Sequence, residues 1–216
     1  MIDLCIINGS PRRQSSNSKY LADEFITFFN KKINSKTFYV SDILKNQNIF
    51  NEILTYHNIL IASPLYVDSF PSSVIQFLWE FSDFLSTKTD IHINLYGLIN
   101  SGFLDGPQNR LAIEILKNFA ISNNLNWKMA IGIGSGEMLK NIKSIPWQKG
   151  PKKTVYNDLI KMKNCIENNG NIDDDILLPT LKFPKRLFIL IANHSWKLQC
   201  KKNYGLNPKE LYKKIY

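Results

Sequence analysis

The sequence IDLCIINGSPRRQSSNS, at residues 2–18, joins a short apolar run to a loop that is rich in serine and asparagine. The run at 2–7 is typical of a buried β-strand, and residues 18–32 space their apolar side chains as an amphipathic helix does. A loop between a strand and a helix N-terminus offers backbone N–H groups and the positive end of the helix dipole to an anion. The stretch therefore predicts a phosphate-binding loop. Its candidate ligands are Ser10, Arg12, Ser16, Asn17 and Ser18.

A simpler interpretation is that Ser16 or Asn17 only caps the following helix. A cap explains one residue, whereas the loop holds several hydroxyl groups with Arg12 beside them. The loop matches neither the GxGxxG dinucleotide fingerprint nor the GxxxxGK[ST] loop that binds nucleoside triphosphates. It therefore predicts a phosphate site of another kind.

Outward from this loop, short apolar runs alternate with helical patterns. Strands are predicted near 37–40, 59–62, 93–99 and 129–133, and helices near 74–85, 111–121 and 155–166. Because the apolar runs are nearly continuous, they favour strands buried on both faces. The alternation predicts an α/β fold with a five-stranded parallel sheet between two layers of helices.

Two further loops follow predicted strands. SPLYVDSFP, at 63–71, follows the third strand, and NSGF, at 100–103, follows the fourth. In an open parallel sheet the carboxyl ends of the strands meet at one edge, where ligands bind. We therefore expect these loops to lie near the loop at residues 9–18.

The three loops together resemble those of the NAD(P)H-dependent FMN reductases and related flavodoxin-like oxidoreductases. The resemblance covers roughly residues 1–170 and implies a doubly wound sheet of order 2-1-3-4-5, with FMN across the ends of strands one, three and four. It implies that the five residues named above surround the phosphate. The ring would lie between two further sets: Pro64, Leu65, Tyr66 and Val67 on one side, and Ser101, Gly102 and Phe103 on the other.

The resemblance also implies a homodimer with the flavin near the subunit interface. Some family positions differ in this chain: Ile75 and Trp79 stand where many relatives have Lys and Asp, and Val67 stands where asparagine often follows the tyrosine. The glycine-rich stretch at 132–136 has two interpretations, which are close approach to the flavin or a substrate, and a flexible turn.

No side-chain constellation for catalysis or metal binding is legible. The three histidines have neither metal nor triad spacing, and the three cysteines lie far apart, without the compact motif of an iron–sulfur cluster. We therefore expect no catalytic side chain and no metal, because a cofactor carries the chemistry. The cysteine usage and the lack of a signal-peptide pattern predict a cytoplasmic protein.

The basic residues concentrate at the C-terminus. Residues 182–216 carry nine Lys or Arg and one acid, so their net charge is +8, while the total is +9. We expect 171–216 to form a linker and a basic helical extension, with a helix at about 184–202. Its apolar stripe would be Leu187, Leu190, Ile191, His194 and Leu198. This segment would pack on protein, remain solvated, or contact a phosphorylated ligand, nucleic acid or an anionic membrane; packing is favoured.

The function predicted from the sequence is an FMN-dependent oxidoreductase. It would pass electrons from NAD(P)H to a quinone, a flavin or another small acceptor. Two alternatives stay open, namely a flavodoxin-type electron carrier and a flavin-free protein that binds nucleic acid or membrane through its basic tail.

Overall fold

A computed structural model describes residues 2–170, 173–207 and 209–210. The chain divides into two compact units, Met1–Leu181 and Lys182–Tyr216, which are described separately below. The first unit therefore extends beyond residue 170, the boundary that we predict from the sequence.

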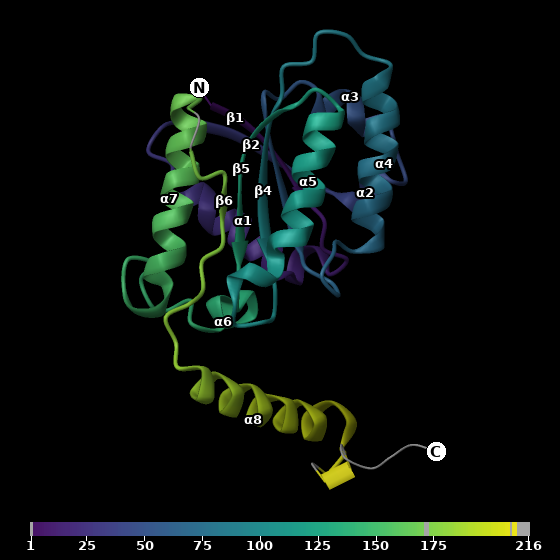
Figure 1. Ribbon diagram of the computed structural model, residues 1–216. Coiled ribbons are helices and arrows are strands. Elements are labelled where there is room, and N and C mark those ends of the chain that lie inside the picture. Colours follow the sequence, from purple (N-terminus) through teal and green to yellow (C-terminus); the bar gives the residue numbers. More distant parts are fainter. Residues whose placement is uncertain (1, 171–172, 208, 211–216) are drawn as a thin grey trace. The chain divides into compact units, whose positions relative to one another are not determined.

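The first unit is built on a parallel sheet of six strands in the order β2-β1-β3-β4-β5-β6 (Figure 1). The strands are β1 (Ile2–Asn8), β2 (Ile33–Tyr39), β3 (Asn58–Pro64), β4 (Asn94–Asn100), β5 (Asn126–Ile133) and β6 (Ile176–Leu177). The order of the first five strands agrees with the order 2-1-3-4-5, whereas the expected count of five was wrong. The sixth strand has only two residues, which is too short to give a periodic pattern in the sequence.

Helices cover both faces of the sheet. They are η1 (Arg13–Ser15), α1 (Asn17–Thr27), α2 (Val40–Ile43), α3 (Ile49–Ile53), α4 (Ser72–Ser86), η2 (Gly106–Asn109), α5 (Arg110–Ser122), α6 (Gly136–Asn141), η3 (Gly150–Lys152) and α7 (Lys153–Asn168). One core cluster joins α2, α3, α4 and α5 to the sheet, and a second joins α1 and α7 to the opposite face. The core thus has two apolar layers, as a doubly wound sheet requires.

Strand β2 differs most from its prediction. We expected a strand at 37–40, but β2 begins at Ile33, and Val40 is the first residue of α2. The strand lies at the edge of the sheet and exposes Asn34, Ser35 and Lys36. Because edge strands in natural proteins commonly carry polar and charged residues, the apolar signal covered only its second half.

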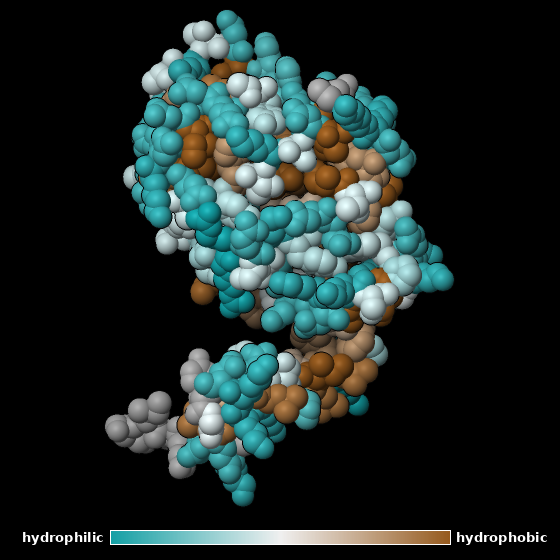
Figure 2. All heavy atoms as spheres, turned by 180° about the vertical axis from the view of Figure 1, so that it is seen from behind, coloured by the Kyte–Doolittle hydropathy of each residue, from teal (hydrophilic) through white to brown (hydrophobic). Residues whose placement is uncertain are grey.

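The second unit contains α8 (Lys185–Tyr204), which matches the helix that we expected at about 184–202. It ends at Gly205, whose φ of 64° gives a left-handed cap, and the Gly205 amide donates to the carbonyl of Lys201. Apolar and hydrophilic residues are interspersed over its surface (Figure 2). Within the described ranges, no helix combines the length and apolarity that crossing a membrane demands.

Candidate functional site

The three loops that we predicted to bind a ligand meet at the carboxyl edge of the sheet. Strand register produces this, because Asn8 lies opposite Ala62 and Pro64 lies opposite Asn100. Backbone bonds tie the loops together there: the Gly9 amide donates to the Ala62 carbonyl (2.9 Å), and the Leu65 amide donates to the Asn100 carbonyl (2.8 Å). The ends of β1, β3 and β4 thus form one continuous rim.

The serines of the first loop are partly engaged by the protein itself. Ser16 is the N-cap of α1. Its hydroxyl oxygen accepts a hydrogen bond from the Lys19 amide (3.1 Å), and its hydroxyl group donates one to the Arg13 carbonyl (2.6 Å). The capping interpretation is thus confirmed for Ser16. Ser10 is also buried, and its hydroxyl accepts from the Arg12 amide (3.3 Å). Capping therefore accounts for one of the five predicted phosphate ligands.

The backbone at the start of α1 keeps unused donors. Within the part of the chain that the structure describes, the amides of Asn17 and Ser18 donate to no protein acceptor. They are the first two amides of an 11-residue helix, so they also lie at its positive dipole end. Two parallel N–H groups at such a position are suited to phosphate oxygens.

The two neighbouring arginines have different environments. Arg13, with φ of 48°, donates to both carboxylate oxygens of Asp42 (2.6 and 2.7 Å), and its guanidinium lies over the Tyr39 ring. The hydrogen bond with Asp42 raises the pKa of Arg13. Arg12 is exposed, and among residues 2–170, 173–207 and 209–210 its guanidinium has no hydrogen bond or ion pair. Arg12 is therefore the arginine that is available to an anion.

Two buried asparagines, which we did not predict, organise the rim. The side chain of Asn8 accepts from the Ser10 amide (2.9 Å) and donates to Ser16 Oγ (3.4 Å). The side-chain amide of Asn100 donates to Ser18 Oγ (2.9 Å) and to the Ser63 carbonyl (3.1 Å). The available signal was that an asparagine ends each of these two apolar strands directly before a loop.

The second loop holds a tight turn from Tyr66 to Ser69. The Tyr66 amide donates to the Ser69 carbonyl (2.7 Å) and the Ser69 amide donates back (3.1 Å). Val67 and Asp68 both have positive φ, at 48° and 60°, as in a type I′ turn. Tyr66 is 44% exposed and Val67 is 94% exposed, whereas Leu65 is buried. Since Pro64 ends β3, the loop begins at the rim. It presents the ring of Tyr66 and the aliphatic side chain of Val67 there.

The third loop presents one buried hydroxyl and one exposed ring. Ser101 is buried, and its Oγ has no hydrogen-bond partner among the described residues. Gly102 is exposed, and a Cβ built there would meet no atom within 4 Å. Phe103 is 56% exposed. This loop therefore offers a polar donor and a flat apolar face at the end of β4.

The glycines at 132–136 serve close packing of the chain on itself. A Cβ at Gly134 would lie 2.2 Å from the carbonyl oxygen of Leu104, and one at Gly136 would lie 2.9 Å from Asn100 Oδ1. These contacts do not describe a flexible turn, while close approach to the flavin or a substrate stays a prediction. The stretch instead packs the loop after β5 against the loop after β4.

These observations fit an FMN. Its phosphate needs donors and positive charge, which the Asn17 and Ser18 amides and Arg12 provide. Its ring system needs flat apolar faces and a few polar groups, which Tyr66, Phe103 and the unpartnered Ser101 hydroxyl provide. The residues present at the rim therefore match both ends of the cofactor in chemical character.

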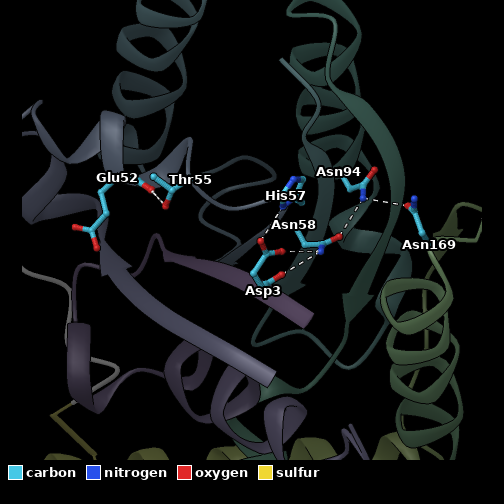
Figure 3. Close-up of polar contacts among 7 residues, drawn as sticks. All are labelled: Asp3, Glu52, Thr55, His57, Asn58, Asn94 and Asn169. Carbon is cyan, nitrogen blue, oxygen red and sulfur yellow. Dashed lines mark hydrogen bonds and ion pairs between the residues drawn. The ribbon is translucent and has the colours of Figure 1, made fainter. Parts of the chain in front are cut away.

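The opposite edge of the sheet carries a separate polar network (Figure 3). There the Asn58 side chain donates to the Asp3 carbonyl (3.0 Å), and Asn94 Nδ2 donates to the side-chain oxygens of Asn58 and Asn169 (3.1 Å each). An open pocket of about 290 Å³ lies beside it, lined in part by His57 and His92. This pocket is at the amino ends of the strands. Since ligands of open parallel sheets bind at the carboxyl ends, we assign the candidate site to the other edge.

No family model matches this chain, and no curated protein matches it either. Solved structures do match. An NADH:FMN oxidoreductase in its apo form has 14% identity and a TM-score of 0.55, over 87% of this chain and 98% of that chain. An NAD(P)H:quinone oxidoreductase from Methanothermobacter marburgensis has 10% identity and a TM-score of 0.54, over 78% of this chain and 96% of that chain.

A third solved structure is an FMN-dependent NADH-azoreductase from Bacillus anthracis str. Ames Ancestor in complex with FMN. It has 12% identity and a TM-score of 0.52, over 79% of this chain and all of that chain (100%). At these identities the likeness concerns the fold. The loops and the sheet therefore agree that this chain has the flavodoxin-like fold found in NAD(P)H-dependent FMN, azo and quinone reductases.

Proposed function

We propose that this protein is an FMN-dependent oxidoreductase that takes electrons from NAD(P)H and passes them to a quinone, a flavin or another small acceptor. The observation that carries the proposal is the pair of unused amides at Asn17 and Ser18, which lies at the same rim as the exposed rings of Tyr66 and Phe103. The three solved structures are FMN or NAD(P)H oxidoreductases by name, which supports the same reaction class.

The residues of this chain would hold and orient the cofactor. The amides of Asn17 and Ser18, with Ser10 and Arg12, would fix the phosphate at the start of α1, while Ser16 would hold the loop in place as the helix cap. Pro64–Val67 and Ser101–Phe103 would flank the ring. Bound FMN would supply the hydride and electron chemistry, so no acid or base side chain is required. The role of the protein is therefore to position the cofactor.

We also propose a homodimer, as the resemblance implies. Helix α4 exposes Ile75 and Trp79, which lie one turn apart on the same face. Large exposed apolar side chains of this kind favour contact with another protein surface. Light scattering during gel filtration tests this proposal. We expect the unmodified protein to have the mass of a dimer, and Trp79→Glu to have a lower dimer fraction.

The direct test of the function is flavin retention and turnover. Purified protein is incubated with FMN, desalted and examined for visible flavin absorbance, and NAD(P)H oxidation is then followed with a quinone acceptor. We expect retained flavin and catalytic turnover. Protein that retains no FMN contradicts the proposal, and protein that retains FMN without steady-state turnover indicates an electron carrier instead.

A substitution separates the phosphate site from the rest of the cofactor site. Asn17→Asp places a negative charge beside the first amides of α1, where an acidic side chain also favours the helix itself. We expect the ratio of FMN affinity to riboflavin affinity to fall by roughly tenfold or more, since only FMN carries the phosphate. Asn17→Ala is the uncharged control. An unchanged ratio in Asn17→Asp would place the phosphate elsewhere.

A further inference from the structure

The second unit is strongly positive, with Glu210 as its one acidic residue. No Asp or Glu occurs between residues 176 and 209, while this interval contains seven basic residues. These are Lys182, Lys185, Arg186, Lys197, Lys201, Lys202 and Lys209, and all of them are exposed. A surface with this charge selects an anionic partner.

The same segment exposes large apolar side chains. Residues 187–192 are six consecutive apolar residues in α8, and at 3.6 residues per turn they cover every side of the helix. Leu190 is 65% exposed and Trp196 is 74% exposed. Figure 2 shows hydrophobic and hydrophilic side chains next to one another over this helix. The partner must therefore accept apolar side chains as well as balance positive charge.

These two properties distinguish between classes of partner. Nucleic acid would satisfy the basic residues but would leave Leu187, Leu190 and Ile191 in water. A second copy of this helix would bring two strongly positive segments together, and like charges repel. A bilayer with anionic lipids offers phosphate groups beside acyl chains, so it matches both properties at once.

We propose that the segment at 182–207 binds the surface of a membrane that contains anionic lipids. The aliphatic side chains around Leu190 enter the acyl boundary, and the lysine stems extend their ammonium groups to the lipid phosphates. Trp196 lies between these layers, where tryptophan is favoured. The helix lies on the membrane and does not cross it, in agreement with the absence of a spanning helix among the described residues.

The test is flotation of the full chain with lipid vesicles. Vesicles of equal parts phosphatidylcholine and phosphatidylglycerol are compared with vesicles of phosphatidylcholine alone. We expect binding to the anionic vesicles only, and weaker binding as salt is raised, because salt screens the attraction of the basic residues. Absence of binding to anionic vesicles overturns the proposal.

Matched variants locate the binding surface. Leu190→Glu and the double variant Lys197→Glu/Lys201→Glu should each lower vesicle binding by roughly tenfold or more. Their controls are Ile121→Glu, at a 60% exposed apolar position of α5, and Lys143→Glu/Lys149→Glu, which makes the same charge change on exposed lysines of the first unit. Both controls should bind as the unmodified chain does.

Other occupants of the surface give different results. If vesicle binding falls equally in the control variants, the whole molecule is attracted to the anionic vesicles by its net charge. That outcome contradicts the proposal. A chain that binds no vesicles, and whose mass in gel filtration changes when Leu190→Glu is introduced, also contradicts the proposal. That result identifies a second copy as the partner. Retention of a DNA probe that depends on Lys197 and Lys201 but not on Leu190, without vesicle binding, identifies nucleic acid instead.

Discussion

At the scale of single residues, Val67 is unusual because a β-branched side chain occupies the left-handed backbone region at a fully exposed position. Its φ is 48°, and no packing of its side chain compensates, since 94% of it is exposed. A non-glycine residue held in such a conformation costs about 1–3 kcal/mol. Strain of this kind concentrates at binding sites, which supports the proposed role of the loop at 63–71 in binding a ligand.

Val67→Asn should therefore stabilise the flavin-free protein. Asparagine adopts the left-handed conformation more readily than valine does. We expect the free energy of unfolding to rise by about 0.5–1 kcal/mol, measured by urea denaturation of protein without flavin. Asp68→Asn, one position later in the same turn, is the control and should change stability little. A loss of stability in Val67→Asn would mean that the turn is not strained.

Gly134 and Gly102 give a second matched pair, because the space around them differs. A Cβ at Gly134 meets the Leu104 carbonyl oxygen at 2.2 Å, whereas one at Gly102 meets nothing within 4 Å. Gly134→Ala should cost about 1–3 kcal/mol of unfolding free energy, since the two loops must move apart. Gly102→Ala should have nearly the same unfolding free energy as the unmodified protein. Thermal denaturation of both variants checks this. Equal effects would contradict the packing role.

The residues of the rim were only partly predictable. Ser16, Asn17 and Ser18 stand in a recognisable strand–loop–helix pattern, so their place could be predicted from the sequence alone. The places of Asn8 and Asn100 at the ends of two apolar strands were also visible, but their roles were not, because these depend on side-chain bonds to residues 8 and 82 positions distant. The strained backbone of Val67 was also hidden, since valine normally indicates a strand.

At the scale of elements, β4 is a strand with a buried asparagine at one end and a half-buried one at the other. Asn100 bonds to Ser18 and Ser63 at the rim, while Asn94 bonds to Asn58 and Asn169 at the opposite edge. The same residue type thus forms side-chain hydrogen bonds at both ends of the strand, one of which lies at the candidate site. Comparing substitutions of the two asparagines therefore separates effects on the candidate site from effects on the stability of the sheet.

Asn100→Ala should reduce both stability and FMN affinity. It leaves the buried Ser63 carbonyl without this donor, at a cost of about 1–3 kcal/mol, and it releases Ser18 at the start of α1. Asn94→Ala should lower stability less and leave FMN affinity unchanged. Flavin fluorescence titration of both variants checks this. If both variants lose FMN affinity equally, Asn100 has no special role in the site.

The edges of the sheet explain where element prediction failed. Central strands β1, β3, β4 and β5 are apolar runs, and each was expected near its true place. Strand β2 is polar over its first half because it is an edge strand, and β6 has too few residues for any period. What fixes β6 is tertiary: the Ala130 amide donates to the Asp175 carbonyl, and Trp127 Nε1 donates to the Asp175 carboxylate (2.7 Å).

At the scale of the whole molecule, the boundary between the two units can be tested by truncation. A chain that ends at Leu181 keeps β6 and should melt within about 2 °C of the full chain. A chain that ends at Gly170, the boundary expected from the sequence, loses buried Leu177 and Leu181 and the Thr180 hydroxyl that accepts from Gly106. It should lose at least about 3 kcal/mol. Equal melting temperatures would mean that β6 contributes nothing.

The concentration of positive charge after Leu181 has a practical consequence for handling the protein. Lys182, Lys185 and Arg186 are exposed where the two units join, so trypsin-like proteases in an extract have adjacent cleavage sites there. Cleavage after Lys182, Lys185 or Arg186 lowers the formal net charge from +9 to +2, +3 or +4, respectively. The clipped product would elute from a cation-exchange column at a lower salt concentration than the full chain. A preparation selected only for the flavodoxin-like domain would then lack the segment with the most distinctive chemistry.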